Sequence, residues 1–173
     1  MTATTPLLRV VVLVSGRGSN LKAISARADA GELPVRIEAV VSDRVDAGAL
    51  DWARARGIAT SVLSPRDFPD REAYGRALGD IVESQAPQLV VLAGFMRILS
   101  DEFVLRFSGR MLNIHPSLLP RYAGLHTHRR ALAAGDREHG ASVHFVTPEL
   151  DGGPVVLQAR VPILPGDDED SLA

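Results

Sequence analysis

The chain alternates between short apolar runs and amphipathic segments. Predominantly apolar runs predict buried strands at residues 8–14, 35–41, 58–63 and 89–93. Apolar positions at helical spacing predict intervening helices at residues 21–30, 46–56 and 71–84. Asp70 is placed to cap the last of these helices. Buried strands of this kind are typical of parallel sheets with both faces covered. The order therefore predicts an α/β fold with a doubly wound, mostly parallel, Rossmann-like sheet and right-handed crossovers.

The second half of the chain changes character. Its pattern predicts a short helix after residue 100 or 101, a strand at 112–115, a helix at 127–135, and strands at 141–146 and 155–161. The last two strands are close in sequence and are joined by a turn-rich segment. We therefore expect them to form an antiparallel hairpin at the edge of the sheet.

A glycine-rich turn, Ser15-Gly16-Arg17-Gly18-Ser19-Asn20, joins the first strand to the first helix. Free backbone N–H groups at a helix N-terminus bind anions, most often phosphate. A dinucleotide fingerprint would need a third glycine where this chain has Leu21, and a P-loop would need Gly-Lys-Ser/Thr. One phosphate therefore fits better than a pyrophosphate. The alternative is a tight turn whose glycines only permit positive φ.

Asn113 and His115 are the strongest candidates for chemistry. Pro116 favours an extended backbone at His115, so Asn113 and His115 should share one face of a strand while Ile114 points into the core. An amide donor beside an imidazole suits a carbonyl oxygen that becomes negative during attack. The alternative is a strand end with a capping Asn and a partly buried His. Asp151, in an Asp-Gly-Gly segment, is also compatible with an ordinary turn.

Two further segments follow predicted strands. The loop at residues 94–99 is apolar, and it suits either a flat apolar ligand or residues that plug the end of a helix. Asp43 ends the second strand, where an acid could bind ribose hydroxyls in a nicotinamide enzyme. We favour a cap of the next element for Asp43. Ligands of doubly wound sheets bind beyond the carboxyl ends of the strands, so the glycine turn, this loop and Asn113/His115 should share one edge.

The composition of the chain argues against several classes of function and site. The chain has 173 residues, 46% of them hydrophobic, which fits a single domain with a full core, preceded by a loose tail at residues 1–6. The net charge of −2 with scattered basic residues argues against nucleic-acid binding. The absence of cysteine excludes disulfides and thiolate chemistry, and the remaining histidines lack metal-ligand spacing, so no metal is expected. The run at residues 7–14 is too short to span a membrane, and we expect a cytoplasmic protein.

Six segments carry a resemblance to a known family: residues 14–20, 92–99, 112–120, 124–128, 140–146 and 149–155. Together they closely resemble the phosphoribosylglycinamide formyltransferases, folate-dependent enzymes of purine synthesis. The resemblance runs in register from Val11 to the end of the chain. The Asn-x-His-Pro-Ser-Leu-Leu-Pro segment alone would not decide, because related folate formyl enzymes share it.

The resemblance implies transfer of the formyl group of 10-formyltetrahydrofolate to the amine of 5′-phosphoribosylglycinamide. It implies small-molecule substrates only, with no nucleic acid or membrane, and it leaves a homodimer open. The phosphate-binding residues would be Gly18, Ser19 and Asn20. The folate-binding residues would be Arg71, Met96, Arg97, Ile98, Leu99 and Asn113. The catalytic residues would be Asn113 and His115, which stabilise the oxyanion, and Asp151, which helps to move a proton.

One departure from the family and several rivals remain. Family members continue with a final helix and strand, so we expect residues 1–173 to be a single formyltransferase domain that lacks them, with the acidic residues 166–173 leading into that helix. Formyltetrahydrofolate deformylase and methionyl-tRNA formyltransferase are alternatives within the family, and the phosphate turn favours the ribonucleotide enzyme. Outside it, a nicotinamide oxidoreductase would use Gly16, Gly18 and Asp43, and a non-catalytic phosphosugar-binding module would leave the Asn113/His115/Asp151 set without a purpose.

Overall fold

A computed structural model of the chain describes residues 6–173, so most of the expected tail lies outside the described residues. The chain divides into two compact units, Met1–Met111 and Leu112–Ala173, and the single domain over residues 1–173 stays a prediction. Within the described range, none of the helices combines the length and the apolar character that crossing a membrane requires.

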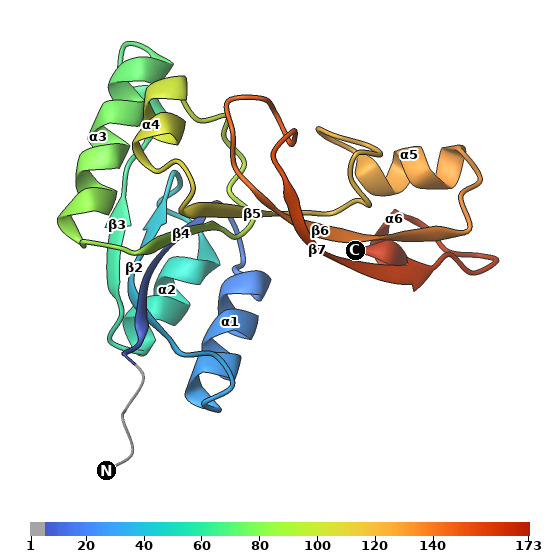
Figure 1. The fold of residues 1–173 in the computed structure, drawn as a ribbon, viewed down its shortest axis with the longest axis horizontal. Helices are drawn as coiled ribbons and strands as arrows, with labels where there is room; N and C mark the ends of the chain where they lie inside the picture. The colour runs from blue at the N-terminus through green and yellow to red at the C-terminus, as the bar shows by residue number, and fades with distance from the viewer. Residues whose placement is uncertain (1–5) are drawn as a thin grey trace. The chain divides into compact units, whose positions relative to one another are not determined.

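The first unit contains four strands of a parallel sheet: β1 (Leu8–Val14), β2 (Val35–Ser42), β3 (Ala59–Val62) and β4 (Leu89–Leu92). Their order is β3-β2-β1-β4, and each adjacent pair is parallel, as the sequence predicts (Figure 1). The chain runs outward from β1 through β2 to β3 and then returns to the other side of β1 at β4. The topological switch point therefore lies between β1 and β4, where ligands of such sheets bind.

Four α-helices connect and cover these strands: α1 (Ser19–Asp29), α2 (Gly48–Ala55), α3 (Arg71–Ser84) and α4 (Asp101–Arg106). A 3₁₀ turn, η1 (Pro65–Asp67), was not predicted from the sequence. The predicted caps are confirmed where a side chain can act: Asp70 Oδ1 accepts a hydrogen bond from Ala73 N at 2.7 Å, and Ser100, rather than Asp101, caps α4.

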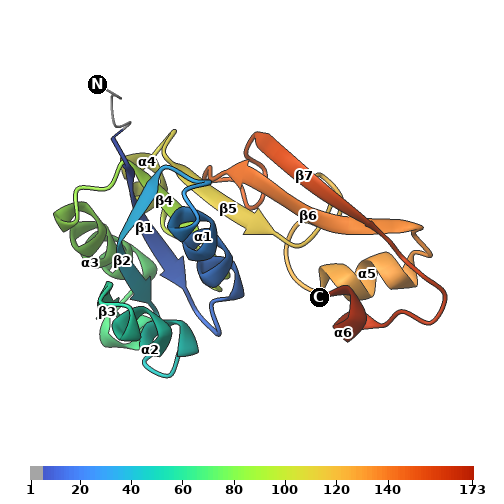
Figure 2. The ribbon, with the colours of Figure 1, turned by 90° about the horizontal axis from the view of Figure 1, so that it is seen from below.

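The helices lie on both faces of the parallel strands, which confirms the doubly wound arrangement (Figure 2). On one face Val10, Val12 and Val14 of β1 form a buried cluster with Leu21 of α1 and Leu50 of α2. Because side chains alternate along a strand, Val11 and Leu13 point to the other face. That face belongs to α3 and α4, whose Leu78 and Phe103 are buried.

The second unit is an antiparallel arrangement of β5 (Met111–His115), β6 (Glu138–Phe145) and β7 (Val155–Pro162), with helices α5 (Thr127–Ala133) and α6 (Glu169–Leu172). β6 pairs with both β5 and β7, so the predicted hairpin is confirmed, although β6 begins three residues earlier than its pattern suggested. The register places Asn113 opposite His144 and His115 opposite Ser142.

Gly18 is constrained in two ways. It directly precedes α1 with a left-handed backbone, φ 76°, and a Cβ placed on it would lie 2.6 Å from Ala49 Cβ in α2. The backbone N–H of Ala49 also donates to the Gly16 carbonyl at 3.1 Å. The glycine turn is therefore packed against the start of α2, and the absence of a side chain at Gly18 permits that contact.

We predict that Gly18→Ala will destabilise the protein more than Gly31→Ala. Gly31 has a similar φ of 73° but open space around its Cβ position, so it serves as the matched control. The left-handed backbone should cost about 1–2 kcal/mol in both variants, and the clash with Ala49 about 1–3 kcal/mol more at Gly18. Urea unfolding measures both, and equal losses would show that the close packing of the turn has no energetic consequence.

Candidate active site

The glycine turn presents the N-terminus of α1 to solvent. The helix begins at Ser19, and Gly18 at the N-cap supplies no side-chain hydrogen bond. The first backbone N–H groups of a helix have no intrahelical acceptor, so they are available to an anion. Ser19 is exposed and Asn20 is half-buried, which leaves both side chains near the helix end. Phosphate binding by Gly18, Ser19 and Asn20 stays a prediction.

The apolar loop at residues 94–99 is divided between core and surface. Phe95 and Leu99 are each 8% exposed, whereas Met96 and Ile98 are 69% and 63% exposed. Residues 95 and 99 pack inward while the three residues between them remain on the surface, and contact with a flat apolar ligand stays a prediction. The residues that point outward are the ones that can contact a flat apolar ligand.

Ser15 joins this loop to the glycine turn. Its backbone N–H donates to the Gly94 carbonyl at 3.0 Å, and its hydroxyl accepts from the Met96 N–H at 2.8 Å. The ends of β1 and β4 are thus connected at the switch point. The structure confirms that these two predicted segments lie together.

Asp43 and Arg71 occupy positions that the sequence did not reveal. The prediction that Asp43 caps the next helix is wrong: α2 begins at Gly48, its N-cap is Ala47, and no side chain caps it. Asp43 Oδ2 instead accepts a hydrogen bond from Arg97 Nε at 2.6 Å. Arg71 is the first residue of α3, and its half-exposed side chain pairs with Glu72 at 3.4 Å.

In the second unit, Asp151 joins the two strand residues predicted to carry the chemistry. Asp151 Oδ2 lies 3.4 Å from His115 Nδ1, and Asp151 Oδ1 lies 3.6 Å from His144 Nε2. Asn113 Nδ2 lies 3.1 Å from the same His144 nitrogen. An amide, two imidazoles and a carboxylate thus form one continuous polar network. The structure brings Asn113, His115 and Asp151 together, as the sequence suggested.

The ring contacts of His115 indicate its proton positions. Nε2 lies 3.0 Å from the Tyr122 carbonyl oxygen, and Nδ1 faces the Asp151 carboxylate. Both partners can only accept hydrogen bonds, provided that the Asp151 carboxyl group is ionised. An imidazolium that donates from both nitrogens satisfies this geometry fully. His115 is 6% exposed, so its ring is largely shielded from water.

His144 is held differently. Its Nδ1 lies 2.9 Å from the Phe145 carbonyl oxygen and must donate to it, so in a neutral ring Nε2 accepts from the Asn113 amide. Protonation of Nε2 would turn that nitrogen into a donor toward Asp151 and would require the Asn113 amide to present its oxygen. The orientation of the Asn113 amide is therefore coupled to the protonation of His144.

The carboxyl pKa of Asp151 is lowered. Burial alone would raise the pKa, but the interaction with His144, the hydrogen bond from Gly124 N–H at 2.9 Å and the charges of the two imidazoles outweigh it. Asp151 also has a left-handed backbone, φ 51°, within its turn. Asp151 therefore stays ionised around neutral pH.

The sequence pattern does not identify His144, Tyr122 and Gly124 as members of this network. His144 was considered only as a metal ligand, although its place opposite Asn113 is the feature that gives it a role. Tyr122 and Gly124 act through a backbone carbonyl and a backbone N–H, which no residue type identifies in a sequence. Across residues 6–173, no group of three or more His, Cys, Asp or Glu side chains is arranged to hold a metal ion.

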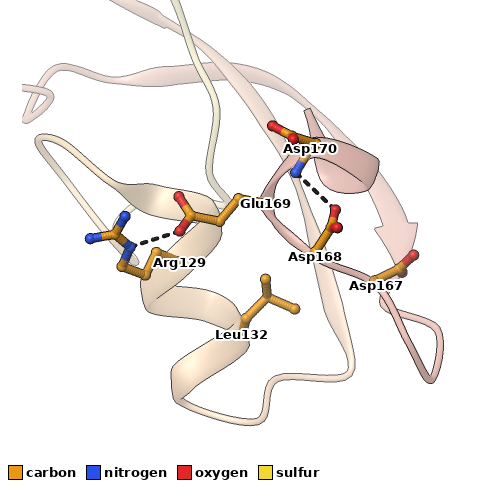
Figure 3. Close-up of a pocket in the computed structure, with 6 residues that line it drawn as sticks. All are labelled: Arg129, Leu132, Asp167, Asp168, Glu169 and Asp170. Carbon is orange, nitrogen blue, oxygen red and sulfur yellow. Dashed lines mark hydrogen bonds and ion pairs between the residues drawn. The ribbon is translucent and has the colours of Figure 1, made fainter.

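The second unit also has a shallow hollow that no residue of this network lines. Arg129, Leu132 and the acidic residues 167–170 line it (Figure 3). Arg129 Nε donates to Glu169 Oε1 at 2.7 Å, and Asp168 caps α6. Four adjacent carboxylates with one paired arginine would repel a phosphate, so this hollow is unsuited to an anionic substrate.

The parallel strands with their switch point, and the polar network of the second unit, define an α/β protein of Rossmann-like class with a candidate acid–base site. Within that class, the chain belongs to the formyl transferase family, whose sequence profile matches residues 8–173. The fold class predicted from the sequence is confirmed by solved relatives. The resemblance to folate-dependent formyltransferases is confirmed as well.

Individual relatives support this membership. Phosphoribosylglycinamide formyltransferase of Escherichia coli (strain K12) is 56% identical over 165 residues, which are 95% of this chain and 78% of that protein. The human trifunctional purine biosynthetic protein adenosine-3 is 40% identical over 165 residues, 95% of this chain and 16% of that protein. The solved phosphoribosylglycinamide formyltransferase from Coxiella burnetii is 49% identical, with a TM-score of 0.91 over 96% of this chain and 78% of that chain.

The lowered pKa of Asp151 predicts a pH-dependent contribution to stability. The folded-state pKa lies below the ordinary value of 3.8, so the stabilisation is fully present above that value and is lost as the pH falls through the folded pKa. Asp151→Asn keeps an acceptor for Gly124 but removes the charge. It should lower the free energy of unfolding by about 1–2 kcal/mol at pH 7.

Urea unfolding at several pH values measures this difference between wild type and Asp151→Asn. The difference should be constant down to about pH 5 and shrink below about pH 4. Asp46→Asn is the control, because Asp46 also has a lowered pKa but pairs with Arg44 in solvent, so its effect should be close to zero. A loss that is identical at pH 7 and pH 3.5 would contradict the charge-based explanation.

Proposed function

We propose that this chain transfers the formyl group of 10-formyltetrahydrofolate to the amine of 5′-phosphoribosylglycinamide. The products are 5′-phosphoribosyl-N-formylglycinamide and tetrahydrofolate, a step of purine synthesis. The observation that carries the proposal is the network of Asn113, His144, Asp151 and His115. Membership of the formyl transferase family and the names of the relatives support the same reaction.

The proposed chemistry is direct transfer. The amine nitrogen attacks the formyl carbon and forms a new N–C bond, which gives a tetrahedral intermediate with a negative oxygen. The bond from that carbon to the folate nitrogen N10 then breaks, and the proton lost by the amine passes to N10. No covalent enzyme intermediate is needed, so the task of the protein is to orient the reactants, stabilise the oxyanion and move one proton.

Each member of the network has a proposed role. Asn113 donates its amide hydrogen to the oxyanion, and His115 donates from its imidazolium. Asp151 faces the His115 imidazole and accepts the proton of the attacking amine, directly or through water. For His115 Nε2 to reach the formyl oxygen, that oxygen must take the place of the Tyr122 carbonyl, which lies 3.0 Å from Nε2. Binding of substrate would thus exchange one acceptor for another.

The substrates have proposed contacts in the first unit. The N-terminus of α1 at Gly18, Ser19 and Asn20 would hold the ribonucleotide phosphate. The exposed side chains of Met96 and Ile98, with the backbone of residues 96–99, would contact the pterin. Arg71 would contact the acidic part of the folate. A homodimer and a cytoplasmic location stay predictions.

A spectrophotometric assay with 10-formyl-5,8-dideazafolate tests the function. We expect turnover of the formyl donor only when the glycinamide ribonucleotide is present. Donor turnover without the ribonucleotide would instead indicate a hydrolase, as in deformylases. No turnover under either condition would contradict the proposal.

Substitutions in the network should abolish transfer without unfolding the protein. We expect Asn113→Ala, His115→Ala and Asp151→Ala each to lower the rate by about 10²–10³, because each removes a donor, or the charge that orients one. Steady-state kinetics measures the rate, and circular dichroism confirms folding. Glu138→Ala is the control, since Glu138 lies exposed on β6 and pairs with Arg160 at 3.2 Å, its one ion-pair partner among residues 6–173. Near-normal turnover in His115→Ala would refute its proposed role.

A further inference from the structure

A buried polar cluster lies at the end of β2 and is not used by the proposed chemistry. It consists of Asp43, Arg97 and Tyr74, which come from β2's end, the loop after β4 and α3. The Asp43 side chain is 1% exposed and the Arg97 side chain is 47% exposed. The ion pair thus extends from the protein interior to the surface of loop 94–99.

Asp43 uses only part of its hydrogen-bonding capacity. Oδ2 accepts from Arg97 Nε at 2.6 Å, and Oδ1 is buried without a protein partner in the described part of the chain. A buried carboxylate loses its hydration, and this cost offsets much of the attraction to its partner. The ion pair therefore contributes little net stability, and a role in holding the loop conformation is the better explanation for it. Its depth also argues against the alternative role for Asp43, since a carboxylate that is 1% exposed is not available to ribose hydroxyls.

Tyr74 contributes a complementary group. Its ring is 4% exposed, and its hydroxyl is buried without a protein partner among residues 6–173. Burial raises the pKa of the phenol far above its usual range, and the Asp43 carboxylate raises it further. The phenol therefore stays protonated and can donate a hydrogen bond, and the Asp43 charge acts on it. Among residues 6–173 neither the Tyr74 hydroxyl nor Asp43 Oδ1 has a hydrogen-bond partner, so these two buried groups are not bonded directly to each other.

Arg97 connects this cluster to the loop surface. Its neighbours Met96 and Ile98 are the exposed residues of the loop, and the Met96 N–H is fixed by the Ser15 hydroxyl at 2.8 Å. The Arg97 guanidinium pairs with Asp43, while Met96 and Ile98 on either side of Arg97 are exposed. Without Asp43, the Arg97 side chain would be free to move into solvent and this constraint on the loop would be lost.

We propose that Asp43 is a positioning residue for the folate site: it holds Arg97, and through Arg97 it holds loop 94–99 in the conformation that receives the pterin. This inference rests on the proposed function, because it assigns the loop to the formyl folate. Asp43 does not touch substrate in this role, so its loss should affect binding of one substrate rather than the chemical step.

Kinetics of Asp43→Ala test the substrate assignment. We expect the KM for 10-formyl-5,8-dideazafolate to rise about tenfold, since a charge-assisted hydrogen bond is lost. The KM for the ribonucleotide should stay within about twofold and kcat within about threefold. Asp43→Asn retains an acceptor for Arg97 and should restore the folate KM to within about threefold of wild type. A folate KM unchanged in Asp43→Ala, or equal changes in both KM values, would overturn the inference.

Hydrogen exchange of the loop gives a readout that does not depend on activity. In Asp43→Ala the amides of residues 94–99, above all Met96, should exchange at least about tenfold faster. Asp46→Ala is the matched control, because it breaks an ion pair to Arg44 at 2.7 Å in solvent nearby in sequence, and it should leave the loop unchanged. Unchanged exchange in Asp43→Ala would overturn the positioning role, whatever the kinetics show.

Two further variants keep the test decisive. Tyr74→Phe removes only the phenol and should accelerate loop exchange less than Asp43→Ala does. If Asp43→Ala does not fold, Arg97→Met in an Asp43→Asn background breaks the same link from its half-exposed end, and the same acceleration is expected. If wild type shows no formyl transfer, the proposed function fails, while the exchange experiment still decides whether Asp43 fixes the loop.

Discussion

The candidate site depends on one carboxylate shared by two imidazoles. Asp151 lies 3.4 Å from His115 and 3.6 Å from His144, and the Gly124 N–H holds it from a third side. Its side chain is 8% exposed, so these partners replace most of its hydration. The ionised aspartate faces Nδ1 of His115 and Nε2 of His144, and the same His144 nitrogen contacts the Asn113 amide. One carboxylate thereby connects both imidazoles and, through His144, the Asn113 amide in a single polar network.

Strand pairing in the second unit places the residues around Asp151. The antiparallel pairing of β5 with β6 places His144 directly opposite Asn113, and Ser142 opposite His115. The Ser142 hydroxyl donates to the Ser117 carbonyl at 2.6 Å and accepts from the Leu119 N–H at 3.0 Å. These bonds fix the loop that follows β5, and the same loop brings the Tyr122 carbonyl to His115. Local backbone pairing therefore determines which groups the catalytic candidates face.

In the first unit, hydrogen bonds connect the segments that follow adjacent strands. The glycine turn and loop 94–99 follow adjacent parallel strands, and Ser15 links them through its backbone and its hydroxyl. Asp43 at the end of the next strand draws in Arg97. Three strand ends are thus connected by the side chains of Ser15, Asp43 and Arg97. Met96 and Ile98 are exposed at this edge of the sheet. The hydrogen bond from the Met96 N–H to the Ser15 hydroxyl holds the loop backbone that carries them.

The sequence pattern alone predicts the strands, the parallel class, the helices α1, α2, α3 and α5 to within two residues at each end, and Asn113, His115 and Asp151 as candidate residues. These follow from apolar periodicity, from capping and turn chemistry, and from motif resemblance, all of which are local in the chain. Only the tertiary structure decided that Asp43 pairs with Arg97, that His144 bridges Asn113 and Asp151, and that Tyr122 and Gly124 act through their backbones. The physical reason is that strand register and loop path bring these partners together across 7 to 54 positions of sequence, and a residue type does not record the group it will face.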